Sequence, residues 1–422
     1  MGWLLYQAGM ASLLVAAAPL LLLRRGGHYL PTLRRRLGGH PAVESRPRLW
    51  IHAVSVGEVM VASTLIRALP ASTPLVLTTV TPTGQAVARR TLTAAGACVT
   101  YLPFDLGLPV RRFLDAYTPC ALVLVEGDLW PLVLERVKRR SLPVIVVNGR
   151  ISDRSYARLR RLRRWVRPLF GPVDLYGVQA ELDRERLIEL GVAPEKVRVT
   201  GNLKFDSPDP PSLPLLERQV RELAAGRPVL VAGSTMRGEE ASVLDAFARI
   251  GGGDRALLVL APRHPERSSE VDERLAAGKL AALRRSSLAD TDSGTAAPAV
   301  LLLDTLGELA SLYRLAAGAF VGGTLVPNGG HNPLEAARFA VPICAGPSME
   351  NFAEIASLLE ARRAWRRVAD AGELAAVWAS WLDDPAAARE LGERGAGLLA
   401  ENRGALERTL DLLGPLLAPI AT

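Results

Sequence analysis

Short apolar segments alternate with helix-like segments along most of this chain, and the alternation limits the folds open to it. The apolar segments lie at 48–54, 74–80, 99–102, 121–125 and 143–147, and then at 228–232, 257–261, 299–303, 317–321 and 341–345. Strands that alternate with helices in this way are typical of a parallel, doubly wound sheet. The proline-rich segment 207–214 separates the two sets, and 422 residues are enough for two separate cores. We therefore expect an α/β protein with two doubly wound, Rossmann-like domains.

The residues just after the expected strands are the first candidates for a functional site. In a doubly wound sheet, ligands bind beyond the carboxyl ends of the strands. In the first half of the chain, Glu58, residues 81–84, Glu126 and Asn148 all lie just after a strand. We expect these residues to converge at one edge of the first sheet.

In the second half of the chain, the segment with the most features of a ligand-binding turn is residues 318–339, GAFVGGTLVPNGGHNPLEAARF. A strand, two glycine pairs and an Ala-rich helix beginning near Pro333 would present free backbone N–H groups, which bind phosphate well. Glu335, about one turn into that helix, is suited to accept hydrogen bonds from a ribose diol. An ordinary tight turn with a solvated glutamate is the alternative interpretation.

The N-terminal segment is apolar enough to cross a membrane. Residues 3–23 carry no charge, and Arg24 and Arg25 follow directly. About 20 such residues cross a ~30 Å hydrocarbon core, and the arginine flank indicates the cytoplasmic side. A cleavable signal peptide would instead need positive charge before the apolar run and a small-residue cleavage site after it. We expect an uncleaved membrane anchor, with an interfacial helix as the alternative.

The expected boundaries follow from the anchor, the proline-rich segment and the last strand. We expect an N-terminal anchor (1–25), a first domain (26–206), a linker (207–218) and a second domain (219–384). The C-terminal helices (385–422) are expected to cross back to the first domain.

Charge and cysteine content narrow the class of partner. The chain has 51 Lys and Arg against 43 Asp and Glu, a formal net charge of +8. Its basic excess lies close to apolar segments, which favours anionic membrane lipids or anionic substrates over nucleic acid. The sequence lacks the aromatic–basic interleaving of a nucleic-acid binder and the spacing of a zinc site. Cys98, Cys120 and Cys344 are far apart, as in a reduced protein without a disulfide framework.

Residues 154–167, RSYARLRRLRRWVR, form the most basic segment of the chain. Seven arginines alternate with apolar residues at helical spacing, so we expect one amphipathic basic helix. The segment is either a solvated face or a surface for anionic lipid or an anionic acceptor.

A series of ordered motifs points to one family. The motifs are WIHAVSVGEV (50–59), GDLWP (127–131), NGRISDRSY (148–156), TGNLKFD (200–206), AGSTMRGEE (232–240), PRHPER (262–267), DTLGEL (304–309), GGHNPLEAA (329–337) and the pair Asn351-Phe352. Together with the expected anchor, they resemble the 3-deoxy-D-manno-octulosonic acid (Kdo) transferases of lipopolysaccharide biosynthesis. The resemblance extends over nearly the whole chain.

The resemblance implies a fold, an activity and a location. It implies the GT-B architecture, in which an N-terminal acceptor-binding domain and a C-terminal CMP-sugar-binding domain face a cleft. It implies an inverting transfer of Kdo from CMP-Kdo to the lipid A precursor (lipid IVA), with no cofactor and no metal. It places the enzyme at the cytoplasmic face of the bacterial inner membrane. The charge pattern described above, rather than the resemblance, is what favours anionic membrane lipids over nucleic acid.

Roles for individual residues are expected partly from the resemblance and partly from the chemistry and position of the residues themselves. Glu58 is the expected general base, although Ser55-x-x-Glu58 also fits a helix capping box. Asp128 and Lys204 are expected to support the transition state. The expected CMP-binding residues are Ser234, Thr235, Pro262, Arg263, Leu306, Gly307, Glu308, Asn332, Pro333, Leu334 and Glu335. The expected acceptor-binding residues are Ser55, Gly57, Thr83, Glu126 and Arg150.

Several positions depart from the family pattern. Met236 stands where the family usually has histidine, and residues 126–132 read EGDLWPL where the family has ETELWPN, so Asp128 keeps a carboxylate on a shorter arm. Two other functions remain open from the sequence. One is a nucleotide-sugar 2-epimerase of the same fold, which would need neither an anchor nor a base at Glu58. The other is an inactive, membrane-tethered scaffold that binds a nucleotide sugar.

Overall fold

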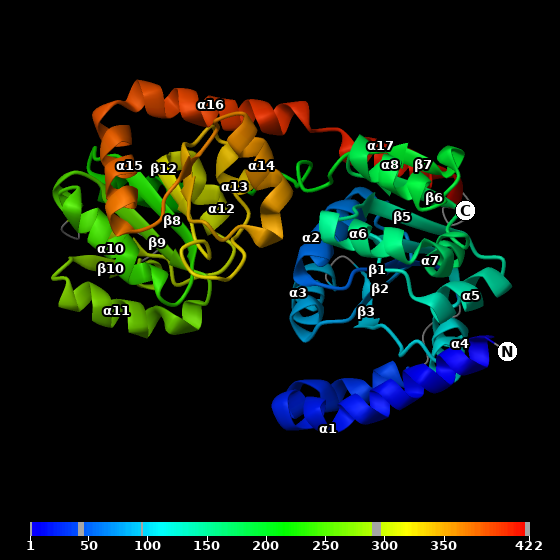
Figure 1. Cartoon of the computed structure of the whole chain (residues 1–422). Coiled ribbons are helices and arrows are strands. Elements are labelled where there is room, and N and C mark those ends of the chain that lie inside the picture. The colour runs from blue at the N-terminus through cyan, green and yellow to red at the C-terminus, as the bar shows by residue number, and fades with distance from the viewer. Residues whose placement is uncertain (1, 41–45, 94–95, 289–296, 418–422) are drawn as a thin grey trace. The chain divides into compact units, whose positions relative to one another are not determined.

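The chain forms two compact units, which are described separately (Figure 1). The computed structural model describes residues 2–40, 46–93, 96–288 and 297–417. The first unit comprises residues 1–208 and 402–422, and the second comprises residues 209–401. Each unit has its own parallel sheet, which confirms the two expected α/β domains. The division after Pro208 falls inside segment 207–218.

The first unit is built on a parallel sheet of seven strands among the described residues. Its order is β3-β2-β1-β4-β5-β6-β7. The strands are β1 (Arg48–His52), β2 (Leu75–Thr79), β3 (Cys98–Tyr101), β4 (Pro119–Val125), β5 (Val144–Gly149), β6 (Leu175–Val178) and β7 (Val197–Val199). The helices are α1 (Gly2–Arg36), α2 (Val56–Ala68), α3 (Pro82–Leu92), α4 (Gly107–Tyr117), α5 (Pro131–Arg139), α6 (Asp153–Arg161), α7 (Arg163–Phe170), α8 (Glu181–Glu189) and α17 (Ala405–Leu417).

Both faces of this sheet are buried, so its strands are apolar on both sides. On β1, Leu49 and Ile51 belong to one core cluster, with residues of α2 and α17. Trp50 points to the other face and packs against Phe113 of α4. The strand order reverses direction between β1 and β4, which creates a topological switch point at their carboxyl ends.

The second unit repeats the plan with a second seven-stranded parallel sheet among its described residues. Its order is β10-β11-β9-β8-β12-β13-β14, and its switch point lies between β8 and β12. The strands are β8 (Val229–Thr235), β9 (Leu257–Pro262), β10 (Ala282–Arg284), β11 (Val300–Leu302), β12 (Ala316–Val321), β13 (Ile343–Ala345) and β14 (Arg366–Arg367). The helices are α9 (Pro214–Ala224), α10 (Glu239–Arg249), α11 (Ser268–Ala277), α12 (Leu309–Leu312), α13 (Leu334–Ala337), α14 (Ala353–Ala361), α15 (Ala371–Asp383) and α16 (Pro385–Glu401).

The C-terminal helices divide between the units. Helix α16 belongs to the second unit, and α17 belongs to the first. Asp206 fixes the start of α17, since its carboxylate accepts hydrogen bonds from the backbone N–H groups of Gly404 (2.9 Å) and Leu406 (2.7 Å). Ala405 and Leu413 are buried in the core cluster that also holds α2.

The N-terminal helix differs from the expected anchor. Helix α1 continues to Arg36, well past the boundary expected at residue 25. The Tyr6 hydroxyl donates to Asp105 (2.6 Å), and Gln7 accepts from the Gly107 N–H (3.0 Å). The part of the chain that the structure describes contains no helix long and apolar enough to cross a membrane.

The basic segment 154–167 is not the single helix that its periodicity predicts. It lies in α6 and α7, which meet at Leu162, where the backbone leaves helical geometry (φ −102°, ψ 17°). The apolar residues Tyr156, Leu159 and Val166 pack against the core cluster of the first unit, as an amphipathic pattern requires.

Candidate functional site

The switch point of the first unit brings together several of the residues expected to carry chemistry. Glu58 lies on α2 after β1, and Glu126 and Asp128 lie in the turn after β4. Asn148 is at the end of β5, and Lys204 follows β7. Their placement follows from the parallel sheet, in which all carboxyl ends lie at one edge.

Glu58 is the most buried carboxylate of this group, with 8% of its surface exposed. Its Oε2 accepts the Val54 N–H (2.7 Å), and its Oε1 accepts the Ser55 hydroxyl (3.0 Å). In a capping box Glu58 would accept the backbone N–H of the N-cap residue Ser55, but here it accepts the N–H of Val54, one residue earlier, and the Ser55 hydroxyl does not cap α2 in return. Glu58 therefore ties the residue before the N-cap to the first turn of α2 without forming a capping box.

Burial raises the pKa of Glu58 to about 7. The hydrogen bond from Val54 opposes this shift, the negative charges of Glu126 and Asp128 add to it, and the Ser55 hydrogen bond opposes it. A carboxylate with a pKa near the working pH is suited to accept a proton during a reaction. The same site therefore gives Glu58 both a cap contact and the pKa of a general base.

Glu126 and Lys204 form an ion pair at the same edge. The Lys204 Nζ lies 3.3 Å from the Glu126 Oε1, and only 18% of the lysine side chain is exposed. Asn148 accepts the Leu203 N–H (2.8 Å) and donates to Glu126 (3.4 Å), so it joins the turn that carries Lys204 to the end of β4. Glu126 and Asn148 both have positive φ, 62° and 53°. Strained backbone of this kind often occurs at functional sites.

Two residues of this edge were not predicted as site residues. The Trp130 indole N–H donates to His52 Nε2 (3.2 Å), and His52 Nδ1 lies 2.9 Å from the Thr78 hydroxyl oxygen. An indole N–H only donates, so His52 must accept and is neutral. Burial lowers the pKa of His52 to about 4, which agrees with this assignment. The two residues fix the GDLWP turn, and their place in two of the motifs was the available signal.

The other predicted acceptor residues take varied positions. Ser55 precedes α2 and Gly57 lies in its first turn. Thr83 is exposed in the first turn of α3. Arg150 is half-buried, and its backbone N–H lies 3.4 Å from the Glu126 carbonyl oxygen. Asp128 is exposed and acts on Glu58 through its charge.

In the second unit, the predicted phosphate-contacting residues lie at the switch point between β8 and β12. Ser234 has a positive φ of 56°, and Thr235 is fully buried. The Arg263 N–H donates to the Thr235 carbonyl (2.9 Å), which joins the ends of β8 and β9. Within the described residues, the Arg263 guanidinium has no hydrogen bond or ion pair, so its fork is free to bind an anion.

The turn after β12 is more complex than the expected strand, turn and helix. The expected Ala-rich helix is α13, which covers only Leu334–Ala337, and the chain turns at Ala340 with φ +53°. Four residues give little macrodipole, so side chains must provide most of the recognition here. The Asn332 side chain accepts the Leu334 N–H (3.1 Å), and Pro333 occupies the N-cap position.

Glu335 and His331 lie in the same electrostatic environment as Arg263. Burial raises the pKa of Glu335, and the charges of Arg338 and Arg263 oppose that shift. Burial, with the charges of Arg263 and His264, lowers the pKa of His331 to about 4. The His331 Nε2 is buried and has no hydrogen-bond partner among the described residues. His331 was not predicted as a site residue.

The turn after β11 supplies the remaining predicted CMP-binding residues. Glu308 is held by Arg285 (3.1 Å) and by the Thr305 hydroxyl. Gly307 has φ +88°, and Leu306 is 61% exposed at the tip of the turn. An exposed leucine on a fixed turn offers apolar contact to a base, and the backbone beside it offers hydrogen bonds. Pro262 ends β9.

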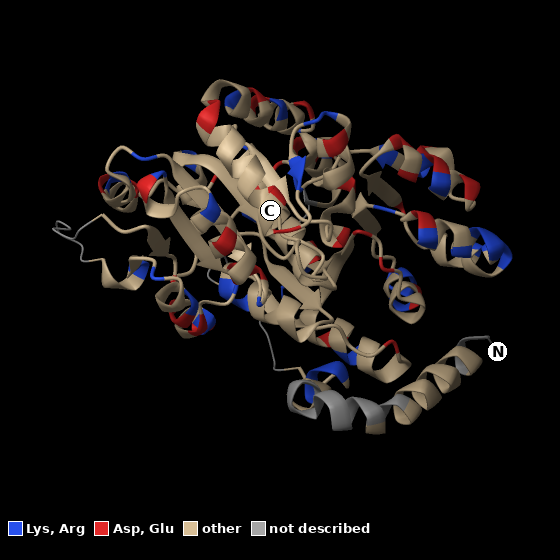
Figure 2. Ribbon diagram, turned by 60° about the vertical axis from the view of Figure 1, so that its left-hand side comes forward, with Lys and Arg blue, Asp and Glu red and all other residues tan. Residues whose placement is uncertain are grey.

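Charged side chains lie mainly on the helices and loops, and the strands are nearly free of them (Figure 2). Across the described ranges, no group of three or more His, Cys, Asp and Glu residues has the arrangement of a metal site.

Comparisons with known proteins identify the family to which the chain is similar. The family model described as 3-Deoxy-D-manno-octulosonic-acid transferase (kdotransferase) matches residues 31–207. The 3-deoxy-D-manno-octulosonic acid transferase of Haemophilus influenzae is 34% identical over 420 residues, which are 96% of this chain and 97% of that protein.

Two solved structures are also similar. A glycosyltransferase from Rickettsia africae is 12% identical, with a TM-score of 0.55 over 88% of this chain and 99% of its own, and shares the fold. The C-terminal CMP-Kdo binding domain of WaaA from Acinetobacter baumannii is 32% identical. It covers 44% of this chain and 96% of its own, with a TM-score of 0.40, too low to support a likeness in fold.

The fold is thus an α/β fold of the GT-B type, with two parallel-sheet domains. With a third of its residues identical to a Kdo transferase along nearly all of both chains, the protein belongs to the 3-deoxy-D-manno-octulosonic acid (Kdo) transferase family.

Proposed function

We propose that this protein transfers Kdo from CMP-Kdo to the lipid A precursor, lipid IVA, with inversion and without a metal, and that Glu58 is the general base. The observation that carries the proposal is Glu58 itself, a buried carboxylate with a pKa of about 7 beside the Glu126–Lys204 pair. A proton acceptor of this kind is what an inverting transfer needs.

The proposed chemistry is a single displacement at the anomeric carbon of Kdo. Glu58 takes the proton of the acceptor hydroxyl, and the acceptor oxygen forms the new glycosidic bond as the bond to the CMP phosphate breaks. Lys204 and Asp128 support the developing charges, and CMP leaves as an anion.

The donor half of the proposal rests on the second unit. The unpaired Arg263 guanidinium would bind the phosphate, with Ser234 and Thr235 beside it. Glu335 would hold the ribose, and the turn at Leu306–Glu308 would contact the cytosine. The loop Asn332–Leu334 would complete the nucleotide site.

The proposed location is the cytoplasmic face of the bacterial inner membrane, with residues 1–25 as the attached segment. On α1, the side chains of Leu5, Leu13 and Val15 are exposed, at 68%, 62% and 74%. Exposed apolar side chains followed by arginines suit contact with a membrane surface.

Helices α6 and α7 are the proposed contact for anionic lipid. The arginines of this pair are exposed, and six of them have no ion pair or hydrogen bond from their guanidinium groups to other described residues: Arg154, Arg158, Arg161, Arg163, Arg164 and Arg167. Trp165 is 82% exposed among them. Tryptophan and arginine together favour the lipid headgroup region.

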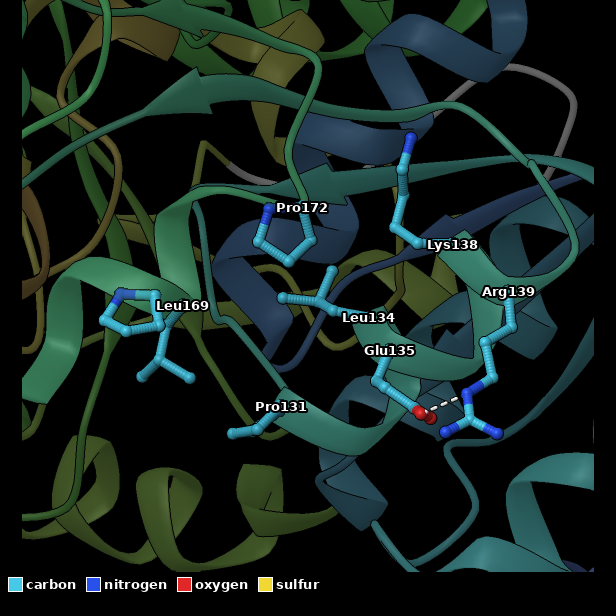
Figure 3. Close-up of a pocket in the computed structure, with 8 residues that line it drawn as sticks. Pro131, Leu134, Glu135, Lys138, Arg139, Leu169 and Pro172 are labelled. Atoms are coloured by element: carbon cyan, nitrogen blue, oxygen red, sulfur yellow. Dashed lines mark ion pairs between the residues drawn. The ribbon is translucent and has the colours of Figure 1, made fainter. Parts of the chain in front are cut away.

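A pocket of about 420 Å³ lies next to this pair, between α5 and α7 (Figure 3). Pro131, Leu134 and Leu169 give it an apolar lining, and Lys138 and Arg139 add basic groups. Both cations are already paired, Lys138 with Asp174 and Arg139 with Glu135. The pocket therefore adds apolar surface to the proposed lipid contact but little free charge.

The test of the function is direct. Purified protein, CMP-Kdo and lipid IVA are incubated, and the lipid products are read by mass spectrometry. We expect the acceptor to gain the mass of Kdo while CMP is released in equal amount. Release of CMP without a glycosylated lipid, or no turnover at all, would contradict the assignment.

The donor site has a separate test. We expect Arg263→Ala and Glu335→Ala each to weaken CMP binding about 10- to 150-fold, because each removes a charged partner of the nucleotide, worth about 1.5–3 kcal/mol. Calorimetry with CMP measures this. Arg237→Ala is the matched control, because Arg237 is an exposed arginine of the same unit that pairs with Glu270. Equal CMP affinity in all three variants would place the nucleotide elsewhere.

A further inference from the structure

Glu239 is a fully buried carboxylate in the first turn of α10, with 0% of its surface exposed. Its Oε2 accepts the backbone N–H groups of Met236 (2.8 Å) and Gly323 (2.6 Å). Its Oε1 accepts those of Thr324 and Leu325, both at 2.8 Å. A carboxylate has about four lone-pair sites, so every one of them is used on backbone.

These four bonds join the two loops that leave the switch point of the second unit. Met236 belongs to the loop after β8 and follows Ser234 and Thr235 directly in the sequence. Gly323, Thr324 and Leu325 open the loop after β12. Ligands of doubly wound sheets bind between two such loops, so Glu239 joins the loops between which the nucleotide is expected to bind.

One further hydrogen bond links Gly323, which Glu239 holds, to the loop that carries the predicted CMP-binding residues. The Gly323 carbonyl accepts the Gly330 N–H (2.8 Å), and Gly330 leads directly into His331 and Asn332. The His331 ring lies so close to Gly323 that a Cβ at 323 would be 3.0 Å from its Cδ2. The position of the loop that carries residues 331–335 therefore depends on where Glu239 holds the Gly323 peptide.

The far part of the same loop has other supports. The Gly329 N–H donates to the Ser348 hydroxyl (2.9 Å), and the Asn351 N–H donates to the Gly329 carbonyl (2.9 Å). Thr324 Oγ1 accepts the Gly346 N–H (2.8 Å). None of these groups bonds to the loop after β8, whereas Glu239 bonds to both loops.

We propose that Glu239 is a positioning residue for the donor nucleotide, which sets the spacing of the two loops that bind CMP. This inference rests on the proposed CMP site and adds to it a residue that does not contact the nucleotide. It also explains how position 236 tolerates methionine, because Glu239 binds the backbone of Met236 and not its side chain.

The test measures, in the full-length protein, both the affinity for CMP and the rate at which the loop amides of residues 323–325 exchange with deuterium. In Glu239→Gln, the amide keeps the length of the side chain, but its NH₂ group faces two N–H donors in place of an acceptor. We expect CMP to bind about 10- to 100-fold more weakly by calorimetry, and the amides of 323–325 to exchange with deuterium faster. Glu239→Asp keeps the charge on a shorter arm, and we expect an intermediate loss.

Glu217→Gln is the matched control. Glu217 is also buried, at 8% exposed, lies in the same unit and accepts a backbone N–H, that of Leu213 (3.1 Å). We expect this change to lower the melting temperature and leave CMP affinity as in the wild type. If Glu239→Gln also lowers only the melting temperature, Glu239 is structural and the inference fails.

One measurement needs no variant. In the wild-type protein without nucleotide, the amides of 323–325 should already exchange slowly, because a buried carboxylate binds them. Exchange as fast as in an exposed loop would overturn the inference even if the Glu239 variants did not fold. Absence of CMP binding by the wild type would instead refute the proposed donor site.

Discussion

Glu58 is held by the contacts of a helix-capping residue, and its pKa is that of a base that works near neutral pH. Capping alone does not need a raised pKa, because a helix N-terminus favours the ionised carboxylate. Burial and the neighbouring carboxylates have the larger effect here. The two roles can be separated because glutamine preserves one of them and removes the other.

The first prediction is that Glu58→Gln abolishes transfer. The amide oxygen can still accept the Val54 N–H, but the side chain can no longer take a proton, a loss of about 10²–10⁴-fold in rate. CMP affinity and folding should stay nearly intact. The measurement is the rate of Kdo transfer to lipid IVA, with calorimetry and thermal unfolding as checks.

Glu373→Gln is the matched control, because Glu373 accepts the Ala369 N–H (2.8 Å) in the same capping geometry on α15. If Glu58 only caps α2, both variants should lose about 1 kcal/mol of stability or less and keep their rate. A near-normal rate in Glu58→Gln would refute the assignment of the base.

The second prediction concerns pH. A base must be ionised, so kcat/KM should rise with pH through about 7. The effect on stability has the opposite sign, since a carboxylate with a raised pKa favours the folded state when protonated. The contribution of Glu58 to the free energy of unfolding should therefore fall as pH rises from about 4.5 to about 7.

Asp128→Asn tests why the pKa of Glu58 is raised. Removal of a negative charge that raises the pKa of Glu58 should move the rise in kcat/KM to lower pH, whatever the variant does to the maximal rate. An unchanged midpoint would mean either that Asp128 does not act on Glu58 or that another group controls the profile.

At the scale of elements, the strands that carry the site were predictable because they are apolar on both faces. β1, β4, β8 and β12 appear within a few residues of their expected positions, since central parallel strands are continuous apolar runs. Edge strands are shorter and more polar. β14 consists of Arg366 and Arg367, and β10 has one leucine, so neither carries the pattern of a strand.

Helices were predicted less well, because periodicity gives a face and not a length. The pattern at 154–167 contains no signal for the break at Leu162. The alanines after Pro333 indicated a helix but not its length, and the chain turns at Ala340 after a single turn of α13. The run 3–23 gave hydropathy but no information on the contact of Tyr6 with Asp105.

The candidate site shows the same division. Residues at the end of a strand or just after it, such as Asn148 and Glu126, could be placed from the sequence because the sheet determines where they lie. Contacts between turns could not be placed, because they depend on side chains from distant parts of the chain. The bond from Trp130 to His52 and the four bonds of Glu239 are of this kind.

At the scale of the whole molecule, the chain has an excess of eight positive charges, and its basic side chains differ in whether they are paired with carboxylates. Many arginines pair with carboxylates, as Arg338 does with Asp209 and Arg267 does with Glu240. The unpaired arginines of α6 and α7 are concentrated in one basic segment. Surface charge of this kind acts on a membrane over about a Debye length, ~10 Å at 0.1 M salt.

The last prediction concerns binding to membranes by the full-length protein. Arg161→Gln with Arg164→Gln removes two positive charges from this segment. Each arginine near an anionic surface contributes about 1 kcal/mol, so the double variant should bind anionic phospholipid vesicles roughly 30-fold more weakly. Binding to uncharged vesicles should not change, and added salt should reduce the difference between variant and wild type.

Arg89→Gln with Arg90→Gln is the matched control for that double variant. Both residues are exposed on α3 and have no ion pair among the described residues, so the change removes the same net charge from another helix. We expect the control to bind anionic vesicles nearly as the wild type does, because attraction depends on charges that lie against the surface. Cosedimentation at several salt concentrations measures both variants. Equal losses would mean that net charge alone governs binding, and that α6 and α7 do not face the lipid.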